Sequence, residues 1–138
     1  EQHYKSALGM FMDNKLFGVG PKLLREYCLK EDYYFKQGCA THPHNYYIQL
    51  LAETGVIGLL PLIILYLVVL SYLFYSIYLI ILNKYTVYVE KKLTSFMPIL
   101  ILLFPLIPTA NFFNNWVSIF TFLCIGIMLH HNIKNKII

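Results

Sequence analysis

The stretch VIGLLPLIILYLVVLSYLFYSIYLIIL, residues 56–82, decides the fold class of this chain. It holds 27 residues and no charged side chain. As an α-helix it would reach about 40 Å, which exceeds the roughly 30 Å hydrocarbon core of a bilayer. Soluble helices rarely run this far without a charge. We therefore predict a tilted membrane-spanning helix over these residues.

The composition around this stretch divides the chain into a polar part and an apolar part. The chain is 58% hydrophobic and only 13% charged, whereas ordinary soluble domains are about 45–50% apolar. Eleven of the eighteen charged side chains lie in residues 1–45, and none lies in residues 54–83. The first 45 residues nearly balance in charge. The pattern argues against a soluble globular domain and gives no support for a nucleic-acid partner.

Two more spans are predicted after the first. Residues 83–92 form a polar connection with three Lys against one Glu. Residues 96–129 are again uncharged, but three prolines and a cluster of three asparagines interrupt them. We predict two short spans at about 95–110 and 114–130. A single broken span with an external tail is the alternative.

The lysines predict which side of the membrane each part faces. Cytoplasmic loops carry an excess of Lys and Arg, so residues 83–94 and the tail 131–138 are predicted to be cytoplasmic. Residues 1–55 then form a partly helical extracytoplasmic loop, and residues 56–138 form the transmembrane region. The predicted class is an all-α integral membrane protein with several transmembrane helices.

A motif lies where the polar loop enters the first predicted span. Residues 41–58 read THPHNYYIQLLAETGVIG, in which a His-Asn pair, nine further residues and then Gly-x-x-Gly follow one another. Upstream, residues 10–21 read MFMDNKLFGVGP and contain a Phe-Gly-Val-Gly-Pro turn. Together these segments resemble the O-antigen ligase and O-antigen polymerase superfamily, whose members share both patterns. The motif positions are His44, Asn45, Gly55 and Gly58.

The resemblance implies a multi-pass glycosyltransferase of the bacterial inner (plasma) membrane, of which this chain is the C-terminal part. Such an enzyme moves a polysaccharide from an undecaprenyl diphosphate carrier to a glycan or lipid A core acceptor on the outer face. It implies no metal, no other cofactor and no nucleotide sugar. Ligases and polymerases share the motif, so both stay open. A non-catalytic anchor or transporter fragment is the alternative from another class, although the spans contain no charged ion site.

His44 is the candidate catalytic base. Glycosyl transfer needs a base for the acceptor hydroxyl and positive charge for the departing diphosphate. Asn45 followed by the periodic run 46–54 and Gly55 predicts an N-cap, a short helix and a C′ glycine. His44 would then lie at the positive end of the helix dipole, which favours a neutral imidazole. The alternative is that His44 only caps the helix.

Three neighbouring residues complete the predicted motif site. Asn45 is included among the substrate-binding residues. His42 precedes His44 across a proline whose fixed φ predicts an extended pair with diverging rings; we expect a substrate contact or an interfacial side chain in preference to a metal ligand. Glu53 shares a helix face with Gln49, and either orients a partner in the site or is a solvated carboxylate.

A second set of candidates lies in the upstream turn and its surroundings. Gly18 and Gly20 allow close approach of the backbone to a phosphate, although a simple tight turn is the alternative. Arg25 is the nearby cation best suited to a diphosphate. The family's own diphosphate-binding arginines precede the matched segment.

The cysteines predict one cross-link. Cys28 and Cys39 both lie in the predicted outer loop, where an oxidising compartment would favour a disulfide between them. Two free thiols are the alternative. Cys124 lies inside the last predicted span and is expected to be an inert apolar side chain.

Overall fold

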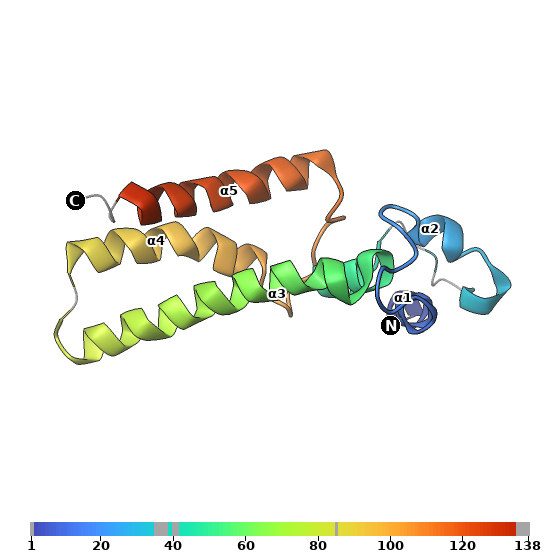
Figure 1. Cartoon of the computed structure of the whole chain (residues 1–138), viewed down its shortest axis with the longest axis horizontal. Coiled ribbons are helices and arrows are strands. Elements are labelled where there is room, and N and C mark those ends of the chain that lie inside the picture. The colour runs from blue at the N-terminus through green and yellow to red at the C-terminus, as the bar shows by residue number, and fades with distance from the viewer. Residues whose placement is uncertain (1, 35–38, 40–41, 85, 135–138) are drawn as a thin grey trace. The chain divides into compact units, whose positions relative to one another are not determined.

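The computed structural model describes residues 2–34, 39, 42–84 and 86–134, and these residues form helices and connecting segments without a strand. This confirms the predicted all-α class. Figure 1 shows the elements α1 (Gln2–Asp13), α2 (Leu24–Tyr27), η1 (Glu31–Tyr33), α3 (Tyr46–Ile81), α4 (Val87–Leu102) and α5 (Asn115–Lys134). The chain forms two compact units. Unit 1 comprises Glu1–Ile63 and Pro105–Ser118, and unit 2 comprises Ile64–Phe104 and Ile119–Ile138.

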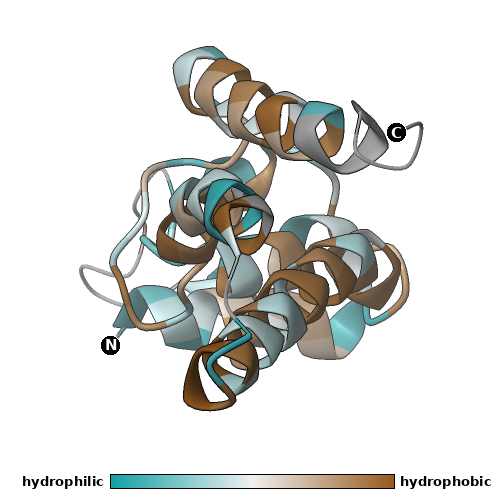
Figure 2. Cartoon of the chain, turned by 90° about the vertical axis from the view of Figure 1, so that its left-hand side faces the viewer, coloured by the Kyte–Doolittle hydropathy of each residue, from teal (hydrophilic) through white to brown (hydrophobic). Residues whose placement is uncertain are grey.

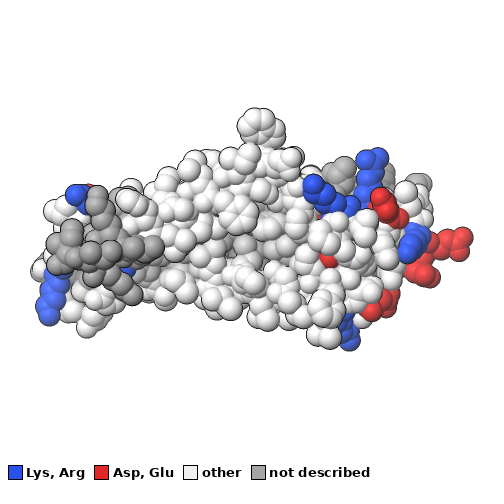
Figure 3. Space-filling view, turned by 45° about the horizontal axis from the view of Figure 1, so that its top comes forward, with Lys and Arg blue, Asp and Glu red and all other residues white. Residues whose placement is uncertain are grey.

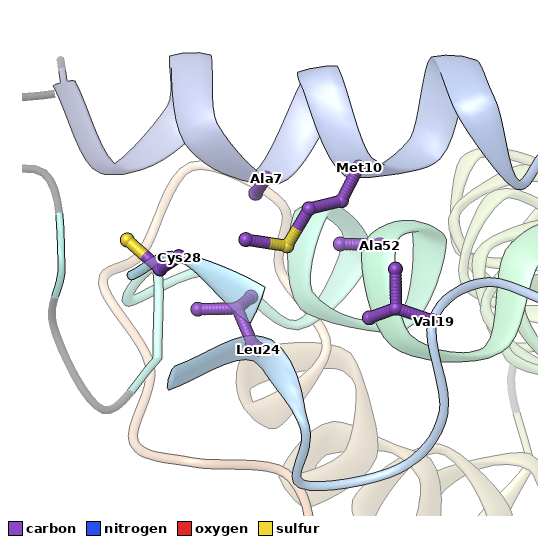
Figure 4. Packing of buried hydrophobic residues seen from close by; sticks show 6 residues of the cluster. All are labelled: Ala7, Met10, Val19, Leu24, Cys28 and Ala52. Carbon is purple, nitrogen blue, oxygen red and sulfur yellow. The ribbon is translucent and has the colours of Figure 1, made fainter. Parts of the chain in front are cut away.

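Unit 1 has a small hydrophobic core beneath α1. Two side chains one helical turn apart, Ala7 and Met10, are buried on the same face of this helix. Figure 4 shows them pointing towards Leu24, Cys28 and Ala52, which come from α2, its C-cap and α3. Through this core, α1 and α2 of the predicted outer loop pack against the first turns of α3.

The helix α3 is broken at Gly55, which has φ 65° and ψ −164°. Because the break interrupts the hydrogen bonds within the helix, the carbonyl groups just before it need hydrogen-bond donors from elsewhere. Val19 N–H donates to the Ala52 carbonyl and Gly20 N–H donates to the Glu53 carbonyl, each at 2.9 Å. The Phe-Gly-Val-Gly-Pro turn therefore pairs with the end of the motif helix.

The segment that precedes this turn also provides acceptors for the first N–H groups of the helix that starts after the break. Val56 N–H donates to the Lys15 carbonyl at 2.9 Å, and Ile57 N–H donates to the Leu16 carbonyl at 3.3 Å. Residues 15–20 thus lie in the break of α3 and bond to both sides of it. We call this arrangement the α3 interlock. It joins the two motifs that the sequence presents separately.

Close backbone packing explains the motif glycines. A Cβ atom at Gly18 would overlap the backbone of Glu53, and a Cβ atom at Gly55 would overlap the Leu16 carbonyl group. At Gly58 the overlap would be with the Thr54 side chain. Gly18 and Gly55 are therefore required by backbone packing at the α3 interlock, whereas Gly58 is in close contact with a side chain of its own helix.

In unit 2, α4 begins earlier than the sequence predicted. Val87, its first residue, falls inside the predicted cytoplasmic connection 83–94, because the Thr86 side chain accepts a bond from Val89 N–H and caps the helix there. The helix ends at Leu102, before two prolines, so the helix predicted over 95–110 is displaced towards the N-terminus. The Tyr72 ring of α3 stacks on Phe96 of α4 with 4.7 Å between centroids.

Among the described residues, α3 is the one helix long and apolar enough to cross a membrane, and α5 carries a shorter apolar stretch, Asn115–His130. Figure 2 shows hydrophobic residues, coloured brown, along much of the helices. In Figure 3 most of the coloured acidic side chains gather over unit 1, as the charge distribution of the sequence requires. The second and third spans, and the sidedness of the loops, stay predictions.

Candidate functional site

The predicted cap of the motif helix is present. The Asn45 side-chain oxygen accepts hydrogen bonds from Tyr47 N–H at 3.0 Å and Ile48 N–H at 3.2 Å. The helix α3 begins at Tyr46. These two bonds satisfy donors that the first turn of a helix leaves unpaired. The capping role therefore belongs to Asn45, and His44 lies directly before it with an exposed side chain.

His44 forms a cluster with two other histidines. Its ring centroid lies 4.3 Å from that of His42 and 6.3 Å from that of His3 on α1. The prediction that the rings of His42 and His44 diverge is therefore wrong. His44 has φ 56°, a positive value that is uncommon outside glycine. Sequence reasoning missed His3, which lies about forty residues away in the chain and carries no local signal.

The environment of His42 favours an uncharged ring. Burial lowers the pKa of His42, and the neighbouring charge of His44 lowers it further, whereas a hydrogen bond with the backbone of Thr109 acts in the opposite direction. A neutral imidazole has a lone pair that can accept a proton or a hydrogen bond. His44 thus faces a neutral neighbour near pH 7.

A loop distant in sequence forms a second wall of this site. Thr109 N–H donates to the His44 carbonyl at 2.9 Å. The Asn45 side-chain amide donates to the Pro105 carbonyl at 2.8 Å. Residues 105–114, which connect α4 to α5, therefore bond directly to the His-Asn pair. We call this segment the α4–α5 loop. The sequence placed residues 105–110 inside the second predicted span and gave no sign of this contact.

Gln49 joins the motif helix to the α4–α5 loop. Its amide nitrogen donates to Glu53 Oε2 at 3.0 Å and to Asn111 Oδ1 at 2.9 Å. Its amide oxygen accepts from Phe112 N–H at 3.0 Å. The side chain is fully buried. Gln49 is a functional candidate that sequence reasoning missed as a site residue, since a polar residue within a short helix is not distinctive by itself.

Glu53 is a buried member of the same network. Only 1% of its surface is exposed, so the interpretation as a solvated carboxylate is wrong. Leu24 N–H donates to Glu53 Oε1 at 3.1 Å, while Oε2 accepts from Gln49. The geometry supports the predicted role of orienting a partner, which is Gln49. Direct contact of Glu53 with substrate stays a prediction.

The residues predicted to bind phosphate have other positions or partners. The backbone N–H groups of the two glycines already donate to carbonyl groups of the chain, and the arginine lies apart from this network. Gly18 N–H donates to the Asn14 carbonyl at 2.8 Å, and Gly20 N–H donates to Glu53. Arg25 is exposed on the short helix α2. The α3 interlock gives both glycines a structural role, and their contact with a phosphate stays a prediction.

The structure contains the predicted disulfide. Cys28 and Cys39 are bonded, with 5.5 Å between their Cα atoms. Cys28 is completely buried in the core of unit 1. Cys124 is a buried free thiol, in agreement with the expectation of an inert side chain. The disulfide closes the segment between α2 and the motif.

No group of three or more His, Cys, Asp or Glu side chains is arranged to hold a metal ion within the residues that the structure describes. The histidine cluster is held instead by ring contacts and by the α4–α5 loop. Independence from metal stays a prediction.

Comparison with known proteins supports the resemblance seen in the sequence. Residues 1–63 match the family model described as O-antigen ligase. The matched segment contains both motifs, the α3 interlock and the histidine cluster, but it excludes the α4–α5 loop. No curated protein and no solved structure matches the chain.

Proposed function

We propose that this protein, whose residues 1–63 match the O-antigen ligase family, is a glycosyltransferase of the bacterial inner membrane. It transfers a polysaccharide from undecaprenyl diphosphate to an acceptor sugar on the outer face. His44 is the general base, and α3 enters the membrane below the site. The family match supports the ligase and polymerase superfamily. The substrate, the reaction and the location are our inference.

The observation that carries this proposal is the setting of His44. Its ring is exposed next to the N-terminus of a capped helix and beside His42, whose pKa is lowered by burial. An exposed imidazole near a neutral partner is accessible to a sugar hydroxyl. General bases need this access and a geometry fixed by neighbouring groups. The capping bonds of Asn45 and the Thr109 bond supply the fixed geometry.

The proposed reaction assigns a step to each of these groups. His44 takes the proton of the acceptor hydroxyl, and the acceptor oxygen bonds to the anomeric carbon of the donor sugar. The bond from that carbon to the diphosphate oxygen breaks, and the electron pair leaves with undecaprenyl diphosphate. The leaving group gains negative charge and requires cations. Arg25 is the candidate in this chain, together with the arginines that the family resemblance places upstream.

The test is glycan transfer by the His44→Ala variant of the full-length protein in membranes that contain the lipid-linked donor. Loss of a general base lowers the rate by roughly a hundredfold or more. His130→Ala is the matched control, because His130 is an exposed histidine on α5. Wild-type transfer by His44→Ala, at equal expression, would remove His44 from the mechanism and return it to a structural role.

The product distinguishes the two activities of the superfamily. A ligase attaches the finished polysaccharide to an acceptor such as lipid A core, whereas a polymerase lengthens the lipid-linked chain. Separating the products of wild-type membranes by size and by lipid content would identify the acceptor.

A further inference from the structure

Thr109 of the α4–α5 loop contacts the histidine cluster through its backbone. Its N–H donates to the His44 carbonyl at 2.9 Å, and its backbone also bonds to His42. Its neighbours Pro108 and Ala110 are exposed, whereas the Thr109 hydroxyl oxygen is buried. Thr109 is therefore a loop residue whose backbone bonds to both His42 and His44.

The hydroxyl of Thr109 has no hydrogen-bond partner in the part of the chain that the structure describes. Buried polar groups in proteins are nearly always paired, because an unpaired group loses its bonds to water without compensation. The positions open to the hydroxyl are also restricted. The β-branched side chain is stiff about χ1, and the bonds of Asn45 and Gln49 hold the loop on both sides of it.

We propose that Thr109 is a substrate-contacting residue of the His44 site and that its hydroxyl group bonds a hydroxyl group of the bound glycan. This inference rests on the proposed function. A threonine hydroxyl can donate one hydrogen bond and accept others, and a sugar hydroxyl has the same capacity. The pair can therefore adjust which group donates while His44 removes the proton of the reacting hydroxyl.

The surroundings favour a sugar hydroxyl over a phosphate as the ligand. The rings of His3 and His42 contact the His44 ring, and the backbone of Thr109 bonds to the His44 carbonyl. None of these three residues carries a permanent positive charge. Diphosphate groups are held mainly by Arg and Lys, which provide charge-assisted hydrogen bonds. A cluster that has a hydroxyl group and no permanent charge is suited to a neutral polar ligand.

The test compares Thr109→Val with Thr109→Ser in the full-length protein, reconstituted with undecaprenyl diphosphate-linked glycan from the producing cells. Valine keeps the shape and removes the hydroxyl, whereas serine keeps the hydroxyl. We expect Thr109→Val to lower transfer roughly three- to tenfold, the effect of one neutral hydrogen bond, and Thr109→Ser to retain most of it. Thr94→Val is the control for the chemical change, because Thr94 is exposed on α4 and bonds its own helix.

Thermal unfolding of the same variants supplies the second readout. Removing an unpaired buried hydroxyl leaves stability unchanged or raises it, so Thr109→Val is expected to combine reduced transfer with an unchanged or higher Tm. Wild-type transfer by Thr109→Val would overturn the inference. A lower Tm together with lower transfer would also overturn it, because it would show that the hydroxyl has a structural partner. Both results leave the proposed function intact, since that depends on the effect of His44→Ala.

Discussion

Gly55 and Leu16 are in such close backbone contact that any side chain at position 55 would overlap the Leu16 carbonyl group. Gly55 also has φ 65° and ψ −164°, a conformation essentially restricted to glycine. The contact lies at the centre of the α3 interlock, where Val56 N–H donates to the Lys15 carbonyl. One glycine thus sets the break in α3 and the position of the upstream turn.

The Gly55→Ala variant should be strongly destabilised. The disfavoured backbone conformation alone costs about 1–3 kcal/mol, and the overlap with Leu16 adds to this cost. We expect a lower Tm in detergent and a reduced yield of folded protein. Gly126→Ala is the matched control, because Gly126 lies within α5 and has open space around its Cβ position. Alanine there is expected to be neutral or stabilising by up to about 1 kcal/mol. Equal Tm values for the two variants would contradict the role of Gly55.

Local features of this fold could be predicted from the sequence, because each depends on residues close together in the chain. The cap at Asn45 follows from an asparagine before a periodic run, and the break at Gly55 follows from a glycine after it. The cross-link between Cys28 and Cys39 follows from two cysteines in one predicted outer loop.

The contact between the α4–α5 loop and the motif helix could not be predicted from local sequence patterns. The bonds from Asn45 to Pro105 and from Gln49 to Asn111 join residues about sixty positions apart. Neither motif nor periodicity contains information about such pairs. Helix α4 was misplaced for a related reason, since its start is set by the Thr86 cap and not by where the charged residues end.

Gln49→Leu should detach the α4–α5 loop. The substitution removes the bonds to Asn111 and Phe112, and it leaves the buried Glu53 carboxylate without one of its donors. Unpaired buried polar groups cost about 1–3 kcal/mol each, so we expect a clear fall in Tm and reduced transfer. Gln2→Leu is the control, because Gln2 is exposed on α1. If Gln49→Leu melted at the wild-type temperature, the network would have no stabilising role.

Reduction of the disulfide should destabilise unit 1. A cross-link that closes a short loop stabilises a protein by about 2–4 kcal/mol, chiefly by restricting the unfolded chain. Cys28 is also buried in the core with Met10 and Ala52, so a reduced thiol there would loosen the packing. We expect a reductant to lower the Tm of the wild-type protein. The double variant Cys28→Ala/Cys39→Ala serves as the control and should not respond to the reductant. An equal fall in the Tm of both proteins would mean that the reductant does not act through this disulfide.

Acidification should destabilise the protein through His42. Burial lowers the pKa of His42 below its usual value, followed in size by the effect of the His44 charge. The folded state therefore binds fewer protons than the unfolded state, so stability rises with pH across this range. The contribution of His42 is complete above pH about 6.5 and is lost as the pH falls through the lowered pKa. The His42→Gln variant removes this titration and keeps a polar side chain of similar length. Measured from pH 7.5 to 5, its Tm should fall less than that of the wild-type protein. Parallel curves for the two proteins would show that His42 titrates alike in the folded and unfolded states.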